Sequence, residues 1–425
     1  MKIATMARIA ADKWFKPRLR ETYWGVSALA SDLKRLKRPE NLAFKRLVLQ
    51  DQWRFMARTA RPVNGESVAR MQHAVRWLLH AQRATPDSGV PLGYFPCRPD
   101  IAGWMPSYPE TTGYIITSLL AYADRFSDEQ AKTAALAMAH WEVSVQMPSG
   151  AVQGGPVCPP SSQTAAAFNT GMVLDGWCSA YLASKDPAVL DAARRAADFL
   201  VTDLDENGYF RTNGAFVSAG EIKTYTCLCA WAMHRFGVAC GERRYQDAAI
   251  KVIEAALRQQ QPNGWFAHNC LTRSDAPLTH TIGYTLQGVL EVGLAAARED
   301  FIAAVKKSID QIIVRIEKSG FLHACFYADW EPASLSSCLT GSAQIAIVCY
   351  RLYECTGVSD YRQAGDLLLN YLKALQVLDA ENPAFSGAIA GSFPIFGDHM
   401  RGGYPNWATK YFLDALLLQE RISAG

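Results

Sequence analysis

The chain has 425 residues, of which 49% are hydrophobic, 20% charged and 11% aromatic, and its formal net charge is +3. This apolar content, with only 30 Gly and 20 Pro, excludes intrinsic disorder and collagen-like repeats. No run of about 18 apolar residues occurs, so the sequence predicts no membrane-spanning helix. The 11 Cys lack the spacing of a disulfide framework, and residues 1–11 lack the pattern of a secretory signal. We therefore expect buried thiols and a cytoplasmic protein.

The charge is unevenly distributed along the chain. Residues 1–70 contain 16 Lys or Arg against 6 Asp or Glu, whereas the remainder is net acidic. Trp14, Trp24 and Phe44 are interleaved with these basic residues. Such a segment is suited to peripheral contact with an anionic membrane face or to steering an acidic polymer. A solvated helical arm packed on the main domain is an equally good interpretation. No zinc-finger, RNA-recognition or helix-turn-helix signature appears, so we expect no nucleic-acid partner.

From residue 66 onward, a Gly followed by an aromatic or aliphatic residue closes one helical stretch after another. These glycines are Gly93, Gly150, Gly208, Gly264, Gly320 and Gly387, at steps of 57, 58, 56, 56 and 67 residues. A period of this length indicates a repeat architecture in which each unit is a pair of helices.

A second helix follows each Gly segment in the same register. These helices are predicted to open near Pro109, Phe168, Glu221, Thr279, Cys338 and Asn406. They are apolar on most sides, which is typical of an interior, whereas partner helices such as 188–200 and 245–258 have one apolar stripe. The sequence therefore predicts an all-α (α/α)6 toroid over residues 66–425, with residues 1–65 as a basic N-terminal helical extension. An open superhelix of hairpins is the structural alternative.

The six helix openings, the Gly-aromatic turns and the chain length resemble the six-hairpin toroid group of carbohydrate-active proteins. That group includes glycoside hydrolases, unsaturated glucuronyl hydrolases, alginate- and heparin-type lyases and uronyl epimerases. The resemblance covers residues 66–425 and concerns the architecture, since no single family's catalytic signature is matched. It implies an oligosaccharide or polysaccharide substrate, bound at the mouth where the inner helices begin.

Glu110, at the start of one inner helix, is the first catalytic candidate. A general acid for glycoside cleavage needs a carboxyl group with a raised pKa and a second carboxylate across the scissile bond. Asp329, Glu331 and Asp398, in loops expected at the mouth, could supply that partner. The structural alternative is that Glu110 only caps its helix.

His280 is the second catalytic candidate, because it begins an inner helix and is spaced i, i+4 from Tyr284. A His/Tyr pair near an Asn could remove the proton next to a uronate carboxyl group, with Arg401 or Lys223 neutralising that carboxylate. This is the chemistry of lyases and uronyl epimerases. The structural alternative is a hydrogen-bonded core histidine.

Further polar and aromatic residues at the register positions and in the loops suit a sugar, because aromatic faces stack on pyranose rings while polar groups bind hydroxyls. The predicted substrate-binding residues are Tyr108, Asn169, Lys223, Tyr225, His268, Asn269, Trp330, Asp398, Arg401 and Tyr404. Cys227, Cys229, Cys270 and His280 do not match a zinc signature, so we expect neither a metal nor a cofactor.

Several functional hypotheses follow for this chain. The first is hydrolysis of a glycosidic bond by Glu110 and a second carboxylate, and the next is a lyase or uronyl C5-epimerase that uses His280 and Tyr284. A terpene cyclase or prenyltransferase on the same ring would need an acidic motif that we do not find. A non-catalytic glycan-binding protein is the remaining alternative. The sequence does not determine the oligomeric state, the sugar or its linkage.

Overall fold

The computed structural model describes residues 42–96, 103–215, 217–218, 221–271, 273–378 and 382–424. Most of the basic segment predicted at the N-terminus, residues 1–41, lies outside the described residues. Within the described ranges the chain forms helices α3 to α15 and five short strands.

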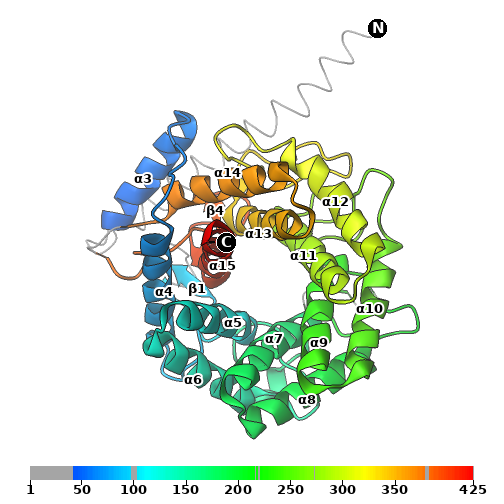
Figure 1. Ribbon diagram of the computed structural model, residues 1–425. Coiled ribbons are helices and arrows are strands. Elements are labelled where there is room, and N and C mark those ends of the chain that lie inside the picture. Colours follow the sequence, from blue (N-terminus) through cyan, green and yellow to red (C-terminus); the bar gives the residue numbers. More distant parts are fainter. Residues whose placement is uncertain are drawn as a thin grey trace.

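The helices form two concentric layers around one axis (Figure 1). The inner helices are α5 Pro109–Phe126, α7 Ala167–Ser184, α9 Cys227–Cys240, α11 Thr279–Ala295, α13 Leu339–Thr356 and α15 Asn406–Ala424. The outer helices are α4 Ser67–Arg83, α6 Glu129–Val145, α8 Pro187–Asp203, α10 Arg243–Leu257, α12 Glu299–Ile313 and α14 Ser359–Leu375. Each inner helix contacts the next, and α15 contacts α5, so the ring is closed. The predicted (α/α)6 toroid is confirmed.

Short and long connections alternate between the two ends of the ring. Each inner helix is joined to the following outer helix by only a few residues, whereas long loops lead from the outer helices to the next inner helix. All six inner helices therefore begin at the same end, which we call the mouth.

Short strands connect the long loops at the mouth. β1 Gly93–Phe95 pairs antiparallel with both β2 Gly103–Trp104 and β5 Tyr404–Pro405. β3 Ser337–Cys338 pairs antiparallel with β4 Ser392–Phe393. Because β1 belongs to the first unit and β5 to the last, their pairing joins the two ends of the ring.

The repeated glycines lie where each loop crosses a neighbouring outer helix. Gly150, Gly208, Gly264, Gly320 and Gly387 have φ values between 84° and 96°, in the left-handed region that favours glycine. A Cβ atom on any of them would lie 2.2–2.8 Å from a backbone carbonyl oxygen of the next outer helix. For Gly387 that oxygen belongs to His73 of α4, so the last repeat packs on the first outer helix.

The first repeat differs from the other five. Gly93 lies in β1, and the left-handed position of the turn is occupied by Ser88, whose φ is 71°. The Val90 N–H, two residues later, donates to Thr112 Oγ1 of the following inner helix at 2.9 Å, and the second and last units contain the same bond. The extra residues between this turn and Gly93 extend the loop into the strand that joins the last unit.

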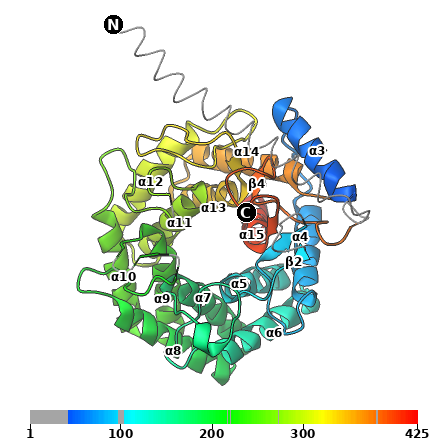
Figure 2. The same cartoon turned by 180° about the vertical axis from the view of Figure 1, so that it is seen from behind.

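Helix α3, Leu42–Met56, lies outside the ring beside α4 and α14 in both views (Figure 1 and Figure 2). Phe55 packs on Phe393 with ring centroids 5.7 Å apart, and the Arg54 guanidinium donates to the Ala374 carbonyl oxygen at 2.7 Å.

The division of the chain at residue 65 remains a prediction. No helix in the described ranges is both long enough and apolar enough to span a membrane.

Replacing Gly320 by Ala should destabilise the ring by about 3 kcal/mol, because the new Cβ would be strained by φ and would meet the Leu367 carbonyl oxygen at 2.3 Å. Gly357→Ala is the matched control, since Gly357 also has positive φ but no atom within 4 Å of the new Cβ. We expect the control to lose about 1 kcal/mol in denaturant unfolding. Equal losses in the two variants would contradict the role of this close approach.

Candidate functional site

Three inner helices present the same pair of positions to the axis of the ring at the mouth. The second residue of each helix is polar or aromatic, and a tyrosine follows four residues later on the same face. The pairs are Glu110 and Tyr114 on α5, His280 and Tyr284 on α11, and Trp407 and Tyr411 on α15. The predicted candidates Glu110, His280 and Tyr284 therefore belong to adjoining layers around one axis.

The His280 ring faces a second imidazole, that of His399, in the loop before α15. The two ring centroids are 5.0 Å apart, and each residue is only 8% exposed. Burial lowers the pKa of His280 to about 4. The pKa of His399 is also well below its usual value, mainly because of burial and to a smaller extent because of repulsion from a charged His280. Both imidazoles are therefore neutral at pH 7.

Two neighbours fix different tautomers of these histidines. Nδ1 of His280 lies 2.8 Å from Oε1 of Gln344. With the amide oxygen on this side, the proton is on Nδ1 and Nε2 carries the lone pair. Nε2 of His399 accepts from the indole N–H of Trp407 at 3.1 Å, so its proton is on Nδ1. Within the described residues, His280 Nε2 and His399 Nδ1 have no hydrogen-bond partner, and neither atom is fully buried. The pair thus presents one acceptor and one donor.

Glu110 contributes a carboxyl group to the same end of the ring. Burial raises its pKa to about 7, although a hydrogen bond from the Tyr108 hydroxyl to Oε2, at 3.0 Å, acts in the opposite direction. Burial raises the pKa of Tyr284 and Tyr411, and the charge of Glu110 adds to both shifts. Glu110 is therefore close to tyrosines that flank the histidine pair, and near pH 7 it is partly protonated.

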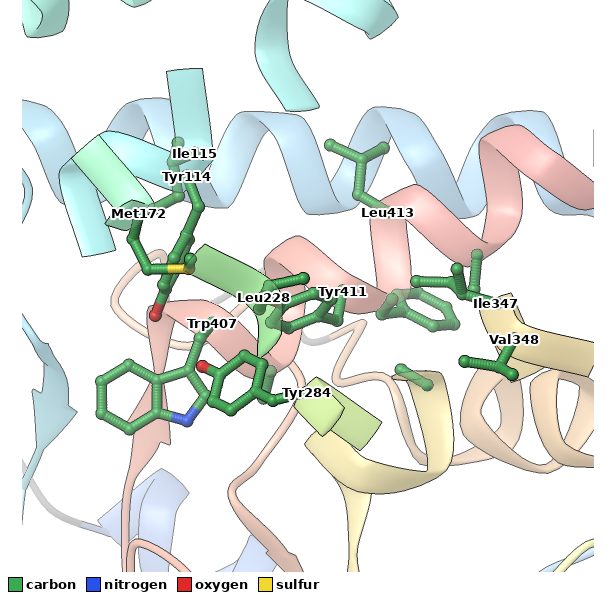
Figure 3. Close-up of a cluster of buried hydrophobic side chains, with 14 of the residues drawn as sticks. Tyr114, Ile115, Met172, Leu228, Tyr284, Ile347, Val348, Trp407, Tyr411 and Leu413 are labelled. Carbon is green, nitrogen blue, oxygen red and sulfur yellow. The ribbon is translucent and has the colours of Figure 1, made fainter. Parts of the chain in front are cut away.

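Aromatic and aliphatic side chains of the inner helices pack together in one cluster, which we call the floor (Figure 3). The Tyr284 ring lies 4.4 Å from that of His280, and the indole of Trp407 is parallel to His280 within 4°. The other members of the floor are Tyr114, Met172, Leu228, Ile347 and Tyr411. This layer places low-polarity surface behind the polar groups of the mouth.

A separate cavity of about 810 Å³ lies on the other side of this floor, toward the C-terminal ends of the inner helices. Its wall contains ion pairs between neighbouring inner helices, including Asp175 with Arg235 and Glu291 with Arg351. The Lys410 ammonium pairs with Asp414 at 2.7 Å on one helix. The predicted catalytic residues do not line this cavity.

Three of the predicted binding residues lie close to Glu110. Tyr108 is bonded to it directly, and Asn169 lies beside Tyr108. Tyr225 is within the range of the Glu110 charge and meets the Phe168 ring edge-on, with centroids 5.2 Å apart.

Lys223, Asn269 and His268 have contacts of another kind. The Lys223 ammonium is buried and binds the Glu221 carboxylate at 2.7 Å. Asn269 Oδ1 accepts from the Thr285 hydroxyl at 2.9 Å, which fixes its loop to α11. His268 is exposed, with a left-handed φ of 58°. These contacts support the loops at the mouth.

The segment containing Asp329, Trp330 and Glu331 forms a turn against the ends of outer helices. The Trp330 ring is buried 4.9 Å from that of Trp265, and its indole N–H donates to the Asn263 carbonyl oxygen at 3.1 Å. Asp329 and Glu331 are exposed, and Asp329 Oδ1 accepts from the Glu331 backbone N–H. The structure does not bring these residues together with the histidine pair.

The segment around His399 that leads to α15 contains three more predicted binding residues, Asp398, Arg401 and Tyr404. Asp398 is exposed and accepts from the Ser336 hydroxyl at 2.6 Å. The Arg401 guanidinium lies 6.0 Å from the Phe396 ring centroid. Tyr404 is buried on the other side of this segment, where its ring stacks on Phe385 at 5.9 Å.

Sequence reasoning missed the importance of His399 and did not identify its partner Trp407 or the His280 partner Gln344. The repeated i, i+4 pairs were a detectable signal for Trp407 and Tyr411, because the same spacing occurs at Glu110 and His280. No local pattern marks Gln344. The described residues contain no group of three or more His, Cys, Asp or Glu side chains arranged to hold a metal ion.

No protein-family model and no curated protein matches this chain. Solved structures do match it. An unsaturated glucuronyl hydrolase specific for heparin gives a TM-score of 0.66 at 15% identity, covering 84% of this chain and 97% of its own. A D-mannose isomerase gives 0.64 at 12% identity, with coverages of 82% and 97%. Cellobiose 2-epimerase from Spirochaeta thermophila gives 0.65 at 13% identity, with coverages of 84% and 96%.

At these identities the likeness establishes a shared fold. The resemblance to the six-hairpin toroid group, inferred from the repeat, is confirmed at that level. The matched structures include hydrolytic and isomerising proteins, so the fold alone does not select a reaction.

The stability of the protein should depend on pH through Glu110. Its pKa is raised from 4.5 to about 7 by burial, so folding favours the protonated form and stability is lost as the pH rises through 7. Glu110→Gln should match the wild type at pH 4 and be more stable by about 2 kcal/mol at pH 8 in denaturant unfolding. Glu129→Gln, at the exposed start of α6, is the control, and its stability difference from the wild type should not grow between pH 4 and pH 8. A pH-independent difference for Glu110→Gln would contradict the raised pKa.

Proposed function

We propose that this protein is a carbohydrate-active enzyme that moves a proton at the carbon next to the carbonyl group of a reducing sugar. The reaction is an aldose–ketose isomerisation or an epimerisation at that carbon. The observation that supports this proposal most directly is the pair of neutral imidazoles, His280 and His399, whose rings are 5.0 Å apart with opposite hydrogen-bonding roles.

Such a reaction needs a base for the C2 proton and a donor for the carbonyl oxygen. The Nε2 lone pair of His280 takes the proton from C2, while the Nδ1–H of His399 donates a hydrogen bond to the carbonyl oxygen as it becomes an enolate oxygen. The electron pair of the C2–H bond forms the C1–C2 double bond of an enediolate. Return of the proton from His280 to C1, with transfer of the O2 hydroxyl proton to O1, gives the ketose. For the epimer, the Nδ1–H of His399 protonates the other face of C2, and proton exchange with water restores both imidazoles.

The low pKa values of the two imidazoles are compatible with this mechanism. Burial that disfavours an isolated imidazolium also strengthens its attraction to an enediolate formed in the same place and at the same time. A neutral His399 can polarise a carbonyl group without competing for the substrate's proton. The Tyr284 and Trp407 rings are buried against His280 and support the position of its imidazole.

Glu110 has a different role in this proposal. Aldoses are mainly cyclic, and ring opening requires a proton at the ring oxygen. A carboxyl group with a pKa of about 7 can donate that proton near neutral pH and take it back on ring closure. Two of the structural neighbours are named as an isomerase and a 2-epimerase, which supports this class of reaction.

Hydrolysis of a glycosidic bond is the second candidate function, favoured by the raised pKa of Glu110. It also requires a second carboxylate across the bond. Among the described residues, none of the groups that interact with Glu110 is a carboxylate. Elimination or epimerisation of a uronate needs a cation for the sugar carboxylate. Lys223 is already paired with Glu221, and the Arg401 guanidinium lies over the Phe396 ring. These observations favour a neutral sugar and proton transfer.

His280→Asn and His399→Asn should each lower kcat/KM for isomerisation or epimerisation by about 100-fold or more, because each removes a proton-transfer or polarising group. The full-length protein is incubated with neutral mono- and disaccharides in heavy water, and deuterium at C2 and new sugar products are followed by NMR. His140→Asn is the matched control, since His140 is exposed on outer helix α6.

Wild-type rates in both histidine variants would contradict the proposal. Release of new reducing ends from oligosaccharides, without deuterium uptake and abolished by Glu110→Gln, would favour hydrolysis. Sugar binding without either reaction would favour a glycan-binding protein.

A further inference from the structure

Helix α3 has two apolar faces, of which the ring covers one. Phe44, Val48 and Phe55 are directed toward the ring, where Phe44 and Val48 are fully buried. Leu49, Trp53 and Met56 recur with helical spacing and are 54%, 66% and 64% exposed. At about 100° per residue, the mean directions of these two sets differ by roughly 130°. The outward set, which we call the α3 outer face, has no apolar partner within the described residues.

Three of the four charged residues of α3 are basic. Arg46 on the helix and Arg58 and Arg61 just beyond its end are exposed, and none of them forms an ion pair with a described residue. Asp51, the one acidic residue of α3, faces the ring and accepts from the Ile395 backbone N–H at 2.5 Å. The sequence of residues 1–41, which precedes α3, contains ten Lys or Arg and four Asp or Glu.

We propose that the α3 outer face docks on an anionic membrane surface. Leucine, methionine and above all tryptophan at the headgroup boundary leave water for a less polar environment, and arginines beside them attract anionic headgroups. An anionic bilayer supplies both components at one surface. The proposal is independent of the reaction at the mouth, because α3 lies outside the ring (Figure 2).

Other occupants fit this surface less well. A symmetric dimer through the α3 outer face would place the same arginines of two copies opposite one another, and Asp51, the acidic residue of α3, faces the ring and not this surface. The preceding segment of the chain is itself basic, so it does not complement the charge.

The test uses the full-length protein and sedimentation with vesicles of phosphatidylcholine alone or with phosphatidylserine. We expect binding to the anionic vesicles, weakened by salt, and little binding to phosphatidylcholine. Trp53→Ala should weaken binding roughly fivefold or more through the lost apolar contact, and Arg46→Glu should weaken it through charge.

Val238→Ala and Arg243→Glu are matched controls, because both residues are exposed on other helices, and both variants should bind like the wild type. The far-ultraviolet circular dichroism and the denaturant midpoint should be unchanged in Trp53→Ala, which separates a membrane defect from misfolding. Equal binding to both vesicle types, or no effect of Trp53→Ala, would overturn the proposal. A dimer in the absence of vesicles that dissociates in Trp53→Ala would also overturn it, in favour of a second copy.

Discussion

Closure of the ring is the constraint on which the rest of this structure depends. Helix α15 packs against α5, strand β5 pairs with β1, and Gly387 lies against the backbone of α4. Each contact joins the last unit to the first. Once the ring is closed, residues four apart on the inner helices form successive layers across one axis, because a helix presents every fourth residue to the same side.

The successive layers have different chemistry. The layer at the helix starts contains Glu110, His280 and Trp407, and the next contains tyrosines and aliphatic side chains that separate the mouth from the rear cavity. Beyond them, charged residues pair between neighbouring inner helices. An apolar layer therefore separates the polar groups of the mouth from the charged residues that line the cavity.

Burial at the mouth determines the protonation states. It lowers the pKa values of His280 and His399 and raises that of Glu110, so neutral bases and a protonated acid coexist near pH 7. The direction of the lone pairs depends on neighbours from other helices, Gln344 and Trp407. The proposed acid–base chemistry therefore requires several units of the ring in their places.

The sequence by itself determined the toroid, the starts of five of the six inner helices and residues of the mouth such as Glu110, His280 and Tyr284; the remaining inner helix begins at Cys227, six residues after the predicted Glu221. These features are encoded by a repeat and by helical spacing, both of which are local. It could not determine that His399 meets His280, 119 residues earlier in the chain, or that Trp330 is buried against Trp265 beside the outer helices. Those contacts join different units, and only the path of each loop around the closed ring decides which side chains meet.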